Sequence, residues 1–169
     1  MERLWSPWRS KYIDSFNNEN ENTGCIFCNC EAVDVNDNSN LIVYKDKLSF
    51  VVLNLYPYNS GHLLVVPYRH TDDFNSFSDE ENLEIMKNLQ LTQNILTKVM
   101  KPHGFNVGAN LGRAAGAGID QHIHFHIVPR WTGDINFMPA LGEVKIISQD
   151  LLDTKKRLVE EFNLIVKSK

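Results

Sequence analysis

Three histidines alternate with apolar residues in one stretch, His122-Ile123-His124-Phe125-His126-Ile127-Val128. Because successive side chains of a β-strand point to opposite faces, this alternation predicts a strand with an imidazole face and an apolar face, ended by Pro129. Neighbouring imidazoles would be roughly 6.6 Å apart at Cα and the outer two about 13 Å apart. One metal ion could reach two of them but hardly three, so at least one must have another role. The alternative is a solvated polar face, which the unbroken apolar face opposite disfavours.

The composition is that of an ordinary globular chain, with 43% hydrophobic and 22% charged residues among 169. We expect one domain over residues 1–169 and a cytoplasmic location, because no apolar run is long enough for a signal segment or a membrane span. The formal charge of −4 argues against nucleic-acid partners, which need a basic surface. All three cysteines lie between Cys25 and Cys30 and cannot form a disulfide framework, so we expect them free or metal-bound.

Short apolar runs bounded by turn residues predict four further strands, over residues 41–44, 48–53, 62–67 and 105–109. Together with the histidine stretch they make five strands joined by mostly short connections. We therefore predict an α+β fold, with an antiparallel sheet and helices on one side of it. Residues 1–24, which hold two of the three tryptophans, are expected to be an extension that packs on the domain or on a second subunit.

Two helices are predicted outside the sheet. Ser78 and Glu81 form a Ser-x-x-Glu capping box, so a long central helix should follow to about Met100, with Leu83 and Met86 on its apolar stripe. A C-terminal helix is expected within residues 145–169, because leucines and other apolar residues recur there at helical spacing.

Cys25-Ile26-Phe27-Cys28 is a C-x-x-C motif, which allows two thiolates to reach one ion and suits Zn²⁺. Alone it is half of a metal site. A redox pair is one alternative, although no thioredoxin-like βαβ pattern surrounds the motif. Two buried cysteines without metal are the other. No role is assigned to Cys30.

A glycine-rich loop precedes the histidine stretch, with Gly112, Gly116 and Gly118 among alanines. Such a loop lets backbone N–H groups approach an anion closely, and beside three imidazoles it suits a phosphate. A plain flexible loop is the alternative. Imidazole is also a good nucleophile toward phosphorus, provided that its second nitrogen is held by an acceptor so that the attacking nitrogen keeps its lone pair.

The histidine stretch resembles the His-φ-His-φ-His-φ-φ signature of the histidine triad family, in which φ is apolar. Further similarities are Ser60-Gly61-His62 with the apolar run to Pro67, and the loop Asn110-x-Gly112 with Gly116-Ala117-Gly118. The segments 4–9, 115–118 and 128–131 are similar to the bacterial branch related to diadenosine tetraphosphate phosphorylases.

This resemblance implies a HIT-like homodimer whose two sheets join, and an enzyme that acts on a purine nucleotide joined through its α-phosphate to a leaving group. It implies that His124 is the nucleophile, that His126 contacts phosphate and assists the leaving group, and that His62 supports the triad. The implied substrate contacts come from the loops beside these strands, namely Asn54, Asn110, Gly116, Ala117, Gly118 and again His126.

Zinc-bearing relatives of the family imply partners for the C-x-x-C motif. The implied ligand set is Cys25, Cys28, His70 and His122, four nitrogen and sulfur ligands of a closed structural zinc site. No organic cofactor is expected.

The sequence is compatible with three functions. The first is a nucleotidyl hydrolase or transferase for dinucleoside polyphosphates or nucleoside phosphoramidates, with water or inorganic phosphate as acceptor. The second is a non-catalytic nucleotide-binding or signalling module. The third is a zinc-stabilised interaction or nucleic-acid-binding protein, which the acidic balance disfavours.

Overall fold

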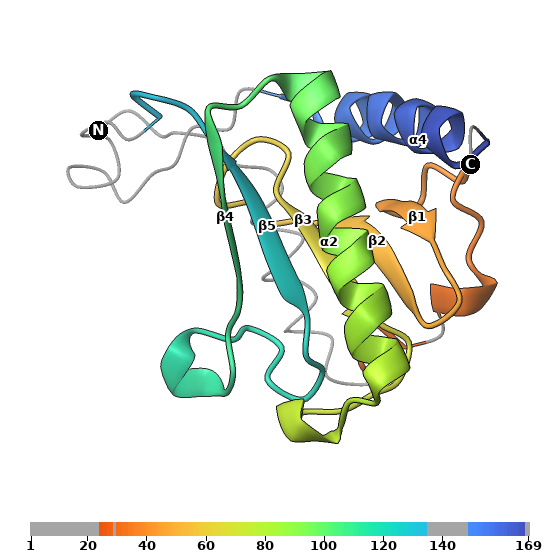
Figure 1. Cartoon of the computed structure of the whole chain (residues 1–169), viewed down its shortest axis with the longest axis vertical. Helices are drawn as coiled ribbons and strands as arrows, with labels where there is room; N and C mark the ends of the chain where they lie inside the picture. Colours follow the sequence, from red (N-terminus) through yellow and green to blue (C-terminus); the bar gives the residue numbers. More distant parts are fainter. Residues whose placement is uncertain (1–23, 29, 135–148, 168–169) are drawn as a thin grey trace, which may run out of the picture.

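The computed structural model describes residues 24–28, 30–134 and 149–167 of the chain. Its centre is a five-stranded antiparallel sheet in the order β1-β2-β3-β5-β4 (Figure 1). The strands are β1 (Ile42–Lys45), β2 (Ser49–Leu53), β3 (Leu63–Pro67), β4 (Gly104–Ala109) and β5 (Phe125–Arg130). The other described elements are the helices α2 (Asp79–Met100) and α4 (Leu151–Lys167) and the 3₁₀ turns η1 (Cys30–Ala32), η2 (Phe74–Ser76) and η3 (Arg113–Ala115). The predicted α+β architecture is confirmed.

The long helix α2 begins where its capping box predicts. Ser78 Oγ accepts a hydrogen bond from Glu81 N at 3.2 Å, and Glu81 Oε2 accepts one from Ser78 N at 2.8 Å. The helix ends at Met100, and Lys101 follows in the left-handed conformation with φ of 50°. In Figure 1, α2 runs across the sheet, and α4 lies beside the C-terminal half of α2. Neither described helix combines the length and the apolarity that crossing a membrane requires.

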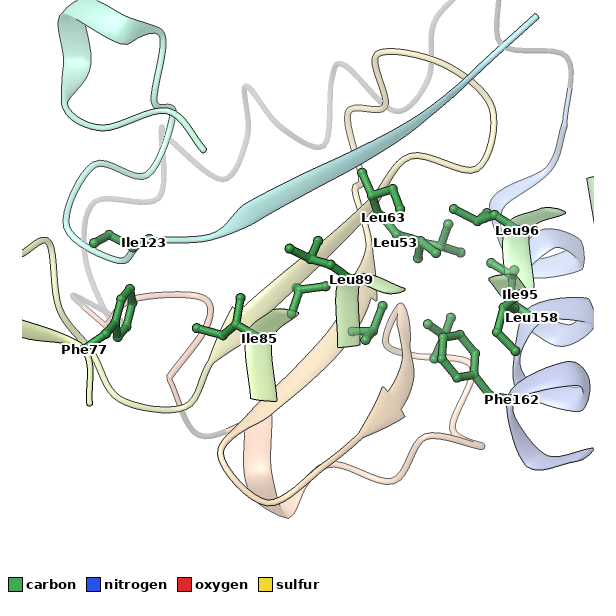
Figure 2. Packing of buried hydrophobic residues seen from close by; sticks show 14 residues of the cluster. Leu53, Leu63, Phe77, Ile85, Leu89, Ile95, Leu96, Ile123, Leu158 and Phe162 are labelled. Carbon is green, nitrogen blue, oxygen red and sulfur yellow. The ribbon is translucent and has the colours of Figure 1, made fainter. Parts of the chain in front are cut away.

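The main hydrophobic core lies between the sheet and the two helices (Figure 2). Because neighbouring residues of a strand point to opposite faces, each strand contributes alternate residues to this core. β3 is buried along its whole length, so its sequence is a continuous apolar run rather than an alternating one. The core residues of the sheet and the helices include Val51, Leu53, Leu63, Val65, Ile127, Ile85, Leu89, Ile95, Leu96, Leu158 and Phe162.

A second, smaller cluster covers the opposite face of the sheet. Ile42, Phe50, Leu64 and Val66 pack there against Phe27, which comes from the segment before β1. Across the sheet, Leu64 of β3 is paired with His126 of β5. Directly opposed residues share a face, so His126 lies on the face away from α2 and α4. The site described below is built on this face.

The histidine stretch forms a strand only in its second half. β5 begins at Phe125, whereas alternation predicts a strand from the first histidine onward. The strand also continues past Pro129 to Arg130, so the expected stop is wrong. Pro129 lies beyond the residues of β5 that pair with β3. Its carbonyl, on the β3 side of the strand, accepts a hydrogen bond from the Asn59 side chain. Proline has no N–H, but an N–H at this position would point to the same side as the carbonyl, so its absence removes no hydrogen bond between β5 and β4.

The apolar stripe of α2 differs from the predicted one. Leu83 and Met86 are each 56% exposed, while Ile85, Leu89, Ile95 and Leu96 face the core. At about 100° per residue, Leu83 and Met86 project well away from Ile85. Periodicity alone did not say which side of the helix the sheet occupies. The N-terminal extension lies outside the described residues except for Gly24, and the C-terminal helix α4 begins at Leu151, within the predicted range.

Candidate functional site

Cys25, Cys28, His70 and His122 converge beside the start of β5. One ligand atom from each residue lies within 4.8 Å of all the others. Cys25 Sγ is 3.3 Å from His122 Nδ1, and Cys28 Sγ is 3.4 Å from His70 Nδ1 and 4.0 Å from His122 Nδ1. A tetrahedral zinc ion with ordinary bond lengths places sulfur and nitrogen ligands about 3.6 Å apart. The four side chains therefore fit one metal ion of this kind.

His122 is prepared to bind a metal through Nδ1. Its other nitrogen, Nε2, lies 2.8 Å from Pro67 O, and because a carbonyl only accepts, Nε2 carries the proton. Nδ1 therefore keeps the lone pair that a metal needs, and a ring held by a backbone carbonyl is the common arrangement of histidine ligands. His122 is fully buried, and burial lowers its pKa. Of the three alternating histidines, only His122 belongs to this cluster.

Two hydrogen-bonded anchors hold the ligand loops. Arg69, next to His70, forms a two-pronged ion pair with Glu81 in the first turn of α2, with N–O distances of 2.7 and 2.9 Å. Lys45 of β1 donates from Nζ to the carbonyls of Glu31 and Val33, just after the cysteines.

His124 has the geometry of a nucleophile. Its Nδ1 lies 2.9 Å from His122 O, so Nδ1 carries the proton and Nε2 keeps its lone pair. Burial lowers the pKa of His124, which favours the neutral ring. A nucleophilic imidazole needs an acceptor on its second nitrogen, and a backbone carbonyl two residues earlier supplies it. The Phe27 ring lies 5.2 Å from the His124 ring and 5.5 Å from the His122 ring.

His62 and His126 form a buried pair. Tyr58 N donates a hydrogen bond to His62 Nδ1 at 3.0 Å, so this nitrogen is an acceptor and the proton lies on Nε2. The Asn54 amide nitrogen lies 3.3 Å from the same atom, and Asn54 Oδ1 accepts from Tyr56 N, which fixes the orientation of the amide. His62 Nε2 then donates to His126 Nδ1 at 2.9 Å.

This pairing places the proton of His126 on Nε2. Among the residues that the structure describes, His126 Nε2 has no hydrogen-bond partner although it is buried. A buried N–H without a partner is unfavourable and is suited to receive an acceptor from a ligand. Burial, and secondarily the neighbouring His124, lower the pKa of His126 to about 4. Its ring lies 4.9 Å from that of His124, so the free Nε2–H is close to the candidate nucleophile.

The glycine-rich loop starts beside these histidines, because Ala109 at the end of β4 is paired with Phe125. Asn110 and His124 are the next residues beyond this pair, so they lie near each other where the two strands begin to separate. Gly112 and Gly116 have φ of 80° and 88°, the left-handed region that glycine allows. In the present conformation the loop satisfies several of its own groups: Gly116 N donates to Arg113 O at 2.9 Å, and Ala117 N donates weakly to Gly112 O at 3.5 Å.

Some residues of the site were not found from the sequence. The backbone N–H of Tyr58 decides the proton position in His62, and a backbone group leaves no signal in a sequence. Asn59 and Asp134 join the loop before β3 to the end of β5 at 2.8 Å, although 75 residues separate them. Their polar types are common in loops, so only the contact identifies them.

The chain belongs to the histidine triad family: the HIT domain model of that family matches residues 35–133. An AP-4-A phosphorylase of Mycobacterium tuberculosis is 41% identical over 96% of this chain and 85% of its own length. An adenosine 5'-monophosphoramidase of Schizosaccharomyces pombe is 35% identical over 63% of this chain and 74% of its own. The crystal structure of a hypothetical histidine triad nucleotide-binding protein of Sulfolobus tokodaii has a TM-score of 0.65 and 25% identity, and the match covers 83% of this chain and 93% of that one.

Proposed function

We propose that the protein is a nucleotidyl hydrolase or transferase that cleaves dinucleoside polyphosphates of the diadenosine tetraphosphate type at the α-phosphate. The proposal rests on one observation above all. The hydrogen bonds of the three buried imidazoles leave a lone pair on His124 Nε2 and a proton on His126 Nε2. Phosphoryl displacement is favoured by a neutral nucleophile next to an N–H that can donate a hydrogen bond to the leaving oxygen. The 41% identity to an AP-4-A phosphorylase supports the substrate class.

The reaction would take two steps. His124 Nε2 forms a bond to the α-phosphorus while the bond from phosphorus to the bridging oxygen of the leaving group breaks. His126 donates a hydrogen bond from Nε2–H to that oxygen, which leaves as a phosphate anion, and His62 holds the His126 ring through Nδ1. In the second step the oxygen of water or of inorganic phosphate forms a bond to phosphorus while the bond from phosphorus to His124 breaks, and the proton of the attacking group is released to solvent.

We assign the substrate contacts to the loops around this pair of histidines. Asn54 follows β2 beside His62, and Asn110 follows β4 beside His124, so each can reach a nucleotide whose α-phosphate lies between the histidines. Gly116, Ala117 and Gly118 would bind phosphate through their N–H groups. The weak bond of Ala117 N to Gly112 O is one that a phosphate oxygen could replace.

We further propose that Cys25, Cys28, His70 and His122 hold a structural zinc ion. Four protein ligands leave no open position for a substrate, so the ion would stabilise the fold rather than take part in the reaction. It would tie the segment before β1 to the start of β5 and fix the ring of His122, whose carbonyl holds His124.

We also propose a homodimer. Among the described strands, β4 is an edge of the sheet, and its Val107 is 55% exposed. An exposed edge strand is a surface on which a second sheet can pair. Sedimentation of the purified protein measures this directly, and a monomer at micromolar concentration would exclude it.

Turnover of diadenosine tetraphosphate, with and without inorganic phosphate, tests the function. ADP formed only with phosphate identifies a phosphorylase, whereas AMP and ATP formed in plain buffer identify a hydrolase. Cleavage of an adenosine phosphoramidate alone would instead favour the phosphoramidase alternative, which the relative from Schizosaccharomyces pombe supports. Nucleotide binding without any cleavage would leave the binding-module alternative.

A further inference from the structure

A group of hydrogen bonds joins the loop before β3 to the end of β5. Asn59 Nδ2 donates to Pro129 O at 3.0 Å and to Asp134 Oδ2 at 2.8 Å, so both amide hydrogens are used. The Asp134 carboxylate also accepts from Arg130 Nε at 2.7 Å, from Arg130 Nη2 at 2.8 Å and from Trp131 N at 3.0 Å. We call this group the Asn59–Asp134 clamp.

The clamp acts on the turn that carries His62. The backbone of Asn59 accepts a hydrogen bond from His62 N at 3.1 Å, which closes the turn. Tyr58 N, one residue before Asn59, donates to His62 Nδ1 at 3.0 Å. With the Asn59 side chain held by Pro129 and Asp134, the position of the Tyr58 N–H relative to the histidine ring is determined by the clamp.

The position of this N–H decides between two proton arrangements of the histidine pair. With a donor at His62 Nδ1, the proton of His62 lies on Nε2, His126 Nδ1 accepts, and His126 Nε2 carries a proton. Without that donor only the longer contact from Asn54 Nδ2, at 3.3 Å, remains at Nδ1, and His62 can more readily hold its proton on Nδ1 and accept from His126 Nδ1–H through Nε2. His126 Nε2 would then hold a lone pair and could not donate a hydrogen bond to a leaving group.

We infer that Asn59 and Asp134 are positioning residues for the reaction, because they hold the Tyr58 N–H that selects the arrangement in which His126 Nε2–H donates a hydrogen bond to the leaving group. Neither residue is expected to touch the substrate. They act indirectly: they hold the turn, the turn positions the N–H that His62 accepts, and His62 sets the proton position in His126. The inference rests on the proposed function for its kinetic consequence only, since the proton positions can be measured without any substrate.

The test compares Asn59→Ala and Asp134→Asn with a matched control. Asn40→Ala also removes an amide that donates to two carbonyls, those of Asp34 and Asp37, but in a loop on the far side of β1. Each protein is labelled with ¹⁵N-histidine, and the protonated nitrogen of each ring is read from long-range ¹H–¹⁵N spectra. The values of kcat and KM for diadenosine tetraphosphate are measured in parallel.

We expect both clamp variants to populate His62 protonated at Nδ1 and to lose about tenfold to a hundredfold in kcat, the scale of a small misplacement in an active site. KM should stay within about threefold, because ground-state binding is not removed. Asn40→Ala should lower the thermal midpoint but keep kcat and both proton positions. Asp134→Asn, which preserves side-chain volume, serves if Asn59→Ala does not fold.

Unchanged proton positions in both clamp variants would overturn the inference, whether kcat falls or stays. A fall in kcat of the same size in Asn40→Ala would overturn it too, since general destabilisation would then be the cause. If the proton positions respond as expected but the wild-type protein cleaves no nucleotide, the proposed function fails and the positioning role stands.

Discussion

Cys25 Sγ lies 3.3 Å from Nδ1 of His122, although 97 residues separate the two in the chain. The contact joins the segment before β1 to the residue whose carbonyl holds His124. Any ion bound there links the fold of the N-terminal segment to the geometry of the proposed nucleophile, without itself meeting the substrate.

Replacing His70 by alanine should remove the metal and destabilise the protein. Three remaining ligands hold zinc less tightly, and the lost binding free energy is lost folding free energy, by at least about 2 kcal/mol or roughly 5 °C in the thermal midpoint. Metal analysis and thermal denaturation, each with and without a chelator, measure this. The chelator should lower the midpoint of the wild type but not that of His70→Ala. Equal responses of the two proteins would contradict the assigned ligand set.

Replacing His124 by alanine should reduce turnover of diadenosine tetraphosphate by about 10⁴-fold or more, as loss of a nucleophile does in other enzymes. The fold should persist, because the His124 side chain has only one described hydrogen bond, to a neighbouring carbonyl. Steady-state kinetics, circular dichroism and AMP binding measure these properties. An acid-labile nucleotide label on the wild type, absent from His124→Ala, would identify the covalent intermediate. Near-normal turnover in the variant would disprove the mechanism.

Stability should fall at mildly acidic pH partly because of His126. Its pKa is about 4 in the folded protein and about 6.5 when unfolded, so the unfolded state binds more protons between these values. The contribution is complete above pH 6.5 and is lost as pH falls toward 4, by at most about 3 kcal/mol. Denaturant unfolding of wild type and His126→Asn from pH 7.5 to 4.5 isolates it, since loss of metal at low pH affects both proteins. If the free energy of unfolding falls equally with pH in both proteins, the burial of His126 does not contribute to the pH dependence.

Gly61→Ala should destabilise the turn before His62. Gly61 has φ of +73°, and a Cβ there would lie 2.3 Å from Sδ of Met100, at the end of α2. The left-handed backbone and the displaced methionine together should cost about 1–3 kcal/mol. Gly104→Ala is the matched control, because a Cβ at Gly104 meets nothing within 4 Å. Denaturant unfolding compares the two variants, and equal stabilities would show that the turn tolerates a side chain.

Much of the fold was predictable because its signals are local. The capping box of Ser78 and Glu81 marks the start of α2, and apolar runs mark all five strands, because backbone periodicity acts over a few residues. Where the prediction failed, at Leu83 and Met86, the missing information was the side of the helix on which the sheet lies. Similarly, the residues around Pro129 do not reveal that the pairing of β3 with β5 stops before Pro129, so that the missing N–H of this proline breaks no strand hydrogen bond.

The sequence by itself determined which residue types carry the chemistry and how they are spaced: three alternating histidines, a C-x-x-C motif and a glycine-rich loop. Only the tertiary structure decided where each proton lies. His62, His122 and His124 are the same residue type, yet a Tyr58 N–H, a Pro67 carbonyl and a His122 carbonyl place the ring proton on Nε2 of His62, on Nε2 of His122 and on Nδ1 of His124. Imidazole tautomers are close in energy, so the hydrogen-bond partners that folding brings near select between them.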